Sequence, residues 1–144
     1  MSDDRHSEWA DLADVVLALA RAITTDAHRD PLVVDLTATE INVMRYVDRH
    51  PGTSPTAVAV ATGLQRSNLS RAIRDLEAKG MIARTADASD GRQARLEPTE
   101  RAAANLARLR ANWSRLLGSA GADGDKLQAA LALLEQLEVG LTPG

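Results

Sequence analysis

Cysteine and phenylalanine are absent from this chain of 144 residues, and only 2% of its residues are aromatic. The lack of cysteine excludes disulfide bonds, thiolate metal ligands and thiol-based redox sensing. The three histidines, His6, His28 and His50, lie far apart without the close spacing of metal-ligand pairs, so we predict no metal site. No catalytic carboxylate pair, Ser/His/Asp set or glycine-rich phosphate loop can be recognised. The sequence therefore predicts a protein that is not an enzyme and has no cofactor.

Long hydrophobic runs are also missing. The longest apolar-rich run, residues 15–20, is far too short to span a bilayer. The segment MSDDRHSEWADLAD is acidic and lacks the basic-then-apolar order of a signal peptide. We therefore expect a soluble, cytoplasmic protein that does not bind a membrane.

Alanine and leucine dominate the apolar residues, and both have high helix propensity. Apolar residues at three- and four-residue steps predict a first helix over residues 8–27. Thr37 and Glu40 have the spacing of a capping box at the start of a second helix. The apolar face of that helix is expected to carry Ile41, Met44 and Val47.

A helix-turn-helix is predicted next. Ser54 is a suitable N-cap with Pro55 at the first helical position, and Gly63 is a suitable C-terminal cap. Another helix follows over residues 66–79. Two short helices joined by a tight turn have the spacing of this motif.

After this motif, the spacing of apolar residues changes from a helical pattern to one typical of strands. Residues 81–85 and 94–97 are typical of two strands, with Asp90-Gly91 as a hairpin signal between them. Pro98 is expected to stop the second strand, and Thr99 to cap a long helix. A last helix is expected over residues 125–138. The apolar side chains on these helices are Ala102, Leu106, Leu109, Trp113, Leu116, Leu117, Leu127, Leu131, Leu134 and Leu137.

Charge is distributed unevenly along the chain. Residues 64–96 contain seven basic and four acidic side chains, a net charge of +3, whereas the whole chain carries −3. The remainder of the chain therefore carries −6. A basic segment in acidic surroundings indicates an anionic partner for that segment.

The helix over residues 66–79 has two chemically different faces. One face is apolar and should pack inward, and it carries Leu69, Ala72, Ile73 and Leu76. The other face carries arginine, asparagine and serine, which suit guanine edges, adenine edges and phosphates respectively. The alternative is a solvated amphipathic helix, but the neighbouring turn and hairpin favour a winged helix-turn-helix that binds DNA. The candidate DNA-binding residues are Ser54, Arg66, Ser67, Asn68, Ser70, Arg71, Arg74, Asp90 and Arg92.

The segment from Leu36 to Ala102 resembles the core of the MarR family of bacterial transcriptional regulators. The resemblance lies in the Leu36-Thr37 helix start, the Gly63-Leu64 turn, the LEAKG helix end over residues 76–80 and the Asp90-Gly91-Arg92 wing pattern. It implies that Arg92 enters a minor groove and that Asp90 orients it. Gln65 and Pro98 depart from the family pattern, which usually has a serine or threonine cap and an apolar strand residue there. We expect a looser helix start and a shorter wing.

The predicted fold is mainly α with a small β-hairpin wing, flanked by N- and C-terminal dimerisation helices. We divide the chain into a dimerisation helix (1–35), a winged helix-turn-helix core (36–98) and dimerisation helices (99–144). The resemblance implies a homodimeric regulator, most often a repressor, that binds double-stranded DNA at a palindromic operator and is often released by a small-molecule effector. Trp9, Tyr46 and Trp113 are expected in the core or the dimer interface. The alternative is a winged-helix module that binds protein instead of DNA.

Overall fold

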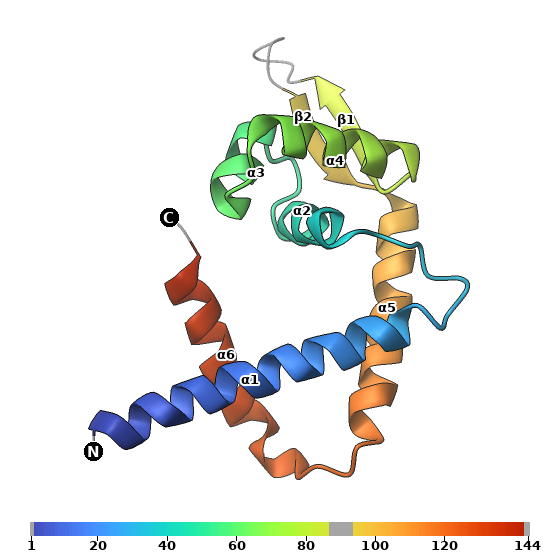
Figure 1. Cartoon of the computed structure of the whole chain (residues 1–144). Coiled ribbons are helices and arrows are strands. Elements are labelled where there is room, and N and C mark those ends of the chain that lie inside the picture. Colours follow the sequence, from blue (N-terminus) through green and yellow to red (C-terminus); the bar gives the residue numbers. More distant parts are fainter. Residues whose placement is uncertain (1, 87–93, 143–144) are drawn as a thin grey trace. The chain divides into compact units, whose positions relative to one another are not determined.

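The computed structural model describes residues 2–86 and 94–142. In this part of the chain, helices predominate and one two-stranded antiparallel hairpin is present (Figure 1). The predicted fold class, mainly α with a β-hairpin, is confirmed. The elements are α1 (Ser2–Ala27), α2 (Ala38–Arg49), α3 (Pro55–Thr62), α4 (Arg66–Ala78), β1 (Ile82–Ala86), β2 (Ala94–Pro98), α5 (Glu100–Gly118), the short 3-10 helix η1 (Gly124–Lys126) and α6 (Leu127–Leu141).

The chain divides into two compact units. The first unit consists of residues 1–33 and 107–121, and the second of residues 34–106 and 122–144. The helix-turn-helix and the hairpin strands belong to the second unit. The division into two dimerisation parts and a DNA-binding core, made from the sequence, stays a prediction.

The hydrophobic core of the second unit is built around α2, which packs against α3, α4 and β2. All four residues predicted to face inward on α4 are buried, which confirms which side of that helix faces the core. On α2, however, Ile41 is exposed and Val43 is fully buried, so the predicted inward position of Ile41 was wrong. The buried apolar residues are Val43, Met44, Val47, Val58, Leu69, Ala72, Ile73, Leu76, Met81, Ile82, Leu96 and Ala102.

Local hydrogen bonds start the helices where the sequence predicted. The backbone N–H of Glu40 donates to Thr37 Oγ1 and the N–H of Thr37 donates to Glu40 Oε2, each at 3.2 Å, so the capping box is complete. The N–H of Ala57 donates to Ser54 Oγ at 3.1 Å. The N–H of Ala102 donates to Thr99 Oγ1 at 3.1 Å. These three caps are confirmed. The first helix, in contrast, begins at Ser2, earlier than predicted.

The hairpin strands extend slightly beyond their predicted ends. Pro98 pairs with Ile82 in the antiparallel register, so it is the last residue of β2 and does not shorten this end of the hairpin. Proline is tolerated there because a strand end needs no ladder N–H from it. Beside the hairpin, the N–H of Leu96 donates to Thr53 O at 2.8 Å, which joins the loop before α3 to β2. The expected Asp90-Gly91 turn lies outside the described residues.

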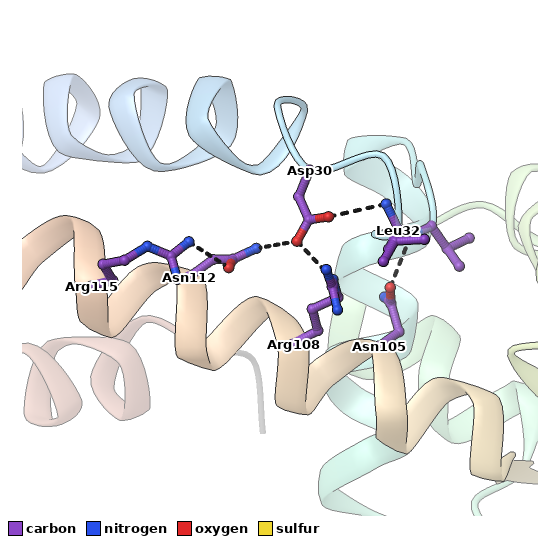
Figure 2. Close-up of polar contacts among 7 residues, drawn as sticks. Asp30, Leu32, Asn105, Arg108, Asn112 and Arg115 are labelled. Atoms are coloured by element: carbon purple, nitrogen blue, oxygen red, sulfur yellow. Dashed lines mark hydrogen bonds and ion pairs between the residues drawn. The ribbon is translucent and has the colours of Figure 1, made fainter.

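The first unit contains a polar network around Asp30 that the sequence did not predict (Figure 2). Asp30 Oδ2 accepts hydrogen bonds from Arg108 Nε at 2.7 Å and Asn112 Nδ2 at 2.9 Å, and Asp30 Oδ1 accepts one from the N–H of Leu32 at 3.0 Å. Asn112 is buried, and its Oδ1 accepts from Arg115 Nη2 at 2.8 Å. The hydrogen bonds from Asn112, Arg108 and Leu32 lower the pKa of Asp30 to about 2, because they stabilise the charged carboxylate. The network fixes the loop after α1 to α5.

Many large apolar side chains of the helices outside the helix-turn-helix remain exposed. On α1, Trp9 is 45% exposed, and on α6 Leu131 and Leu134 are 43% and 41% exposed. Within the described residues, Tyr46 stacks on His50 and Trp113 is only partly buried. In the described part of the chain, no helix is long and apolar enough to cross a membrane.

Candidate nucleic-acid interface

The turn between α3 and α4 positions the start of the candidate recognition helix. Gly63 ends α3 in the left-handed conformation, with φ of 69°, which glycine adopts without steric cost. Leu64 packs against the core and Gln65 is the N-cap of α4. Gln65 makes no side-chain capping hydrogen bond, so the first N–H groups of α4 keep their capacity to bind an anion.

The outward face of α4 is fully accessible. The four buried residues of α4 fix the helix against the core, which turns the opposite side to the solvent. The six candidate residues on α4 are therefore all exposed, and they are Arg66, Ser67, Asn68, Ser70, Arg71 and Arg74. The structure thus brings them together on one helix surface. Whether they contact DNA stays a prediction.

The basic side chains of this region differ in their partners. Among the described residues, Arg66 and Arg71 have no ion-pair partner, and Arg74 Nε makes only a long bond of 3.4 Å to Ser70 O of its own helix. Lys79 is paired with Glu40, and Arg84 with Glu77. The arginines of α4 without an ion-pair partner among the described residues therefore lie on its N-terminal and central turns, whereas Lys79 and Arg84 each share their charge with a carboxylate.

The remaining candidates lie away from α4. Ser54 is half-buried, and its Oγ is engaged as the cap of α3, but a hydroxyl that accepts a hydrogen bond can still donate one. Asp90 and Arg92 lie outside the described residues, so their assignment to the wing stays a prediction.

The C-terminal end of α4 is held by contacts that the sequence did not reveal. Lys79 Nζ donates to Glu40 Oε2 at 2.6 Å and to Asp35 O at 2.9 Å. Gly80 has φ of 73°, and Thr99 Oγ1 donates to its carbonyl oxygen at 2.5 Å. The capping box signalled Glu40, but no local pattern links it to Lys79, which follows 39 residues later.

Residues 34–93 match the model of the MarR family. Solved structures extend this likeness over nearly the whole chain. A putative transcriptional regulator from Pseudomonas aeruginosa is 27% identical, with a TM-score of 0.72, and the match covers 94% of this chain and 95% of that one. The helix-turn-helix region of the chain is therefore similar to the MarR family, and the fold is that of MarR-type structures.

Two further structures show how far the MarR-family likeness extends. A MarR-family transcription regulator that is 19% identical has a TM-score of 0.70, covers 94% of this chain and 89% of its own, and supports the fold alone. The transcriptional repressor CouR, solved bound to a 23-mer DNA duplex, is 26% identical with a TM-score of 0.66, and the match covers 88% of this chain and 89% of CouR.

The MarR-family match contains the whole helix-turn-helix. Residues 34–93 run from the loop before α2, through α3 and α4, to β1 and the segment after it. The exposed polar face of α4 therefore lies inside the matched region, whereas α1, α5 and α6 lie outside it.

Proposed function

We propose that this protein is a DNA-binding transcriptional repressor of the MarR type that acts as a homodimer on a palindromic operator. The observation that carries the proposal is the exposed face of α4, where arginine and asparagine side chains stand on a helix that the core holds in place. Arg71 and Arg74 suit guanine edges, and Asn68 suits an adenine edge. A face that binds protein would instead favour aromatic side chains, and the outward face of α4 has none.

The backbone of α4 favours the same ligand. Its N-terminal N–H groups and the partial positive charge of the helix dipole attract phosphate, and Arg66 adds a full charge at the same end. CouR, which is similar over most of the chain, is bound to duplex DNA in its structure. We infer that the N-terminal half of α4 enters the major groove, with Ser54 and Ser67 as phosphate contacts.

A homodimer accounts for the exposed apolar side chains on α1 and α6. Several leucines and valines on these helices are more than two-fifths exposed in the single chain, including Leu17, Leu19, Leu127 and Leu131. Large exposed apolar stripes mark interaction surfaces, and a two-fold partner presents the same stripes in return. Two recognition helices related by that axis would bind an inverted repeat with half-site centres about 10 bp apart.

The wing and the effector complete the proposal. We infer that Arg92 binds in the minor groove with Asp90 as its orienting acid, because a narrow minor groove attracts arginine. From the resemblance to the MarR family we also infer that a small-molecule effector releases the protein from its operator, which is tested by screening small molecules for loss of operator binding.

The experiment that tests the function is a binding titration with duplexes from the upstream region of the protein's own gene. For a DNA-binding dimer, the logarithm of the binding constant should fall linearly with the logarithm of the salt concentration, and the slope should correspond to several phosphate contacts. A MarR-fold module that binds protein instead would show no binding to any of these duplexes at low salt, and that result would overturn the proposal.

A further inference from the structure

The last turn of α4 carries an acidic side chain on the same side as the candidate DNA-binding residues. Glu77 follows Ser70 by seven residues and Arg74 by three, so these side chains leave the helix in one row. A carboxylate at the edge of a DNA-binding surface repels phosphate unless a cation neutralises it. Whether Glu77 repels an anionic ligand of α4 therefore depends on the cation with which it is paired.

Arg84 of β1 supplies the neutralising charge. Its Nη2 donates to Glu77 Oε1 at 2.9 Å. Alternate residues of a strand share a face, so Arg84 lies on the same face as Ile82, which is buried in the core. Arg84 is thus the first residue of that face to leave the core, and the ion pair joins the end of α4 to the hairpin.

Arg84 keeps most of its capacity to bind a further anion. A guanidinium has five N–H donors, and the bond to Glu77 uses one of them. Its side chain is 43% exposed, which leaves the group open to solvent. An arginine oriented by a carboxylate suits a phosphate, because its planar fork matches phosphate oxygens and loses little rotamer freedom on binding.

We propose that Arg84 is a phosphate-binding residue that extends the DNA-binding surface of α4 onto the hairpin, with Glu77 as the residue that positions it. The inference rests on the proposed function, because the contact forms only if α4 binds duplex DNA. Phosphate contacts fix the orientation of a protein on DNA without sequence preference. Arg84 therefore strengthens binding to every duplex by the same factor.

The test uses a charge-matched variant. Replacing Arg84 alone would leave Glu77 unpaired beside the DNA, and its repulsion would lower the affinity for a trivial reason. The double variant Glu77→Gln/Arg84→Gln has the same net charge as the wild-type pair and keeps two side chains that can form a hydrogen bond. The single variant Glu77→Gln keeps Arg84 and removes the acid. Arg71→Ala serves as a control for base contact by α4.

Each variant is titrated with the specific duplex and with an unrelated duplex over a range of salt, and its Tm is measured. We expect the double variant to bind both duplexes about tenfold more weakly, with a salt slope shallower by about 1 per protomer and a Tm near that of the wild type. Glu77→Gln removes the charge that repels phosphate but keeps an amide oxygen that can accept the hydrogen bond that positions Arg84, so this variant should bind more tightly at low salt.

The outcomes separate the two proposals. If the wild type binds and Arg71→Ala loses specificity, but the double variant keeps wild-type affinity and slope, the role of Arg84 is wrong and the proposed function stands. If the double variant loses affinity only in proportion to a lowered Tm, the pair is structural and the inference is likewise wrong. If the wild type binds no duplex, the proposed function fails and the inference fails with it.

Discussion

Lys79 Nζ lies 2.6 Å from Glu40 Oε2, so the end of α4 is tied to the first turn of α2 by an ion pair whose carboxylate is only 4% exposed. The same carboxylate closes the capping box with Thr37, and Lys79 also donates to Asp35 O. One acidic side chain thus starts α2 and fixes the C-terminal end of the candidate recognition helix.

Lys79→Met should destabilise the protein, because it leaves Glu40 buried without its cation. Breaking a fully buried ion pair would have a larger effect than breaking this one, because the Lys79 side chain is 33% exposed and solvent screens its charge. We therefore expect the free energy of unfolding to fall by about 2 kcal/mol. Urea denaturation measures the change. The control is Lys126→Met on η1, where Lys126 has no ion pair with any described residue. Equal stability of the two variants would contradict a stabilising role for the pair.

The network around Asp30 predicts a pH dependence of stability. The pKa of the Asp30 carboxyl is lowered from 3.8 to about 2 in the folded state, so the charged carboxylate stabilises the fold above the unfolded-state pKa. That contribution is lost as the pH falls from about 4 towards 2. Asp30→Asn should therefore lose less stability than the wild type over this window. The measurement is Tm against pH for both proteins, and parallel curves would show that the hydrogen bonds of Asp30 do not lower its pKa.

The sequence predicted the features that depend on neighbouring residues. Thr37, Ser54, Gly63 and Thr99 lie where expected because a cap is formed by residues a few positions apart. The inward face of α4 was also predicted correctly, because its large apolar residues, Leu69, Ile73 and Leu76, recur at helical spacing among polar or small ones. On α2 the assignment of Ile41 was wrong because Ile41 and Val43 are both apolar, and only packing decides between them.

Features that depend on distant residues could not be predicted. The pairs Glu40–Lys79 and Glu77–Arg84 form only when separate elements pack together. Asn105 and Asn112 are buried on α5, where a polar residue would ordinarily be assigned to the surface. Their seven-residue spacing places them on one side of the helix, but the partners that make burial tolerable, such as Asp30, lie about 80 residues away.

Substitution of α6 tests the dimer. Leu131→Asp/Leu134→Asp changes two leucines that are each about two-fifths exposed, so an isolated chain should fold almost unchanged. In the proposed homodimer the added charges would be buried at the interface, which is strongly unfavourable. Sedimentation velocity should show a monomer that binds operator weakly. Leu32→Asp, at a 69% exposed position outside the helices, is the control. A wild-type protein that sediments as a monomer would contradict the dimer.

The most direct measurement of the central claim compares specific and non-specific binding by Arg71→Ala and Arg74→Ala. Both side chains are exposed on α4, neither forms an ion pair with a described residue, and their loss should not affect folding. We predict a loss of about 1–3 kcal/mol for each variant at the operator, with a much smaller loss on an unrelated duplex, because base contacts carry the specificity. Equal losses on both duplexes would contradict the claim, because the two arginines would then contact only phosphates.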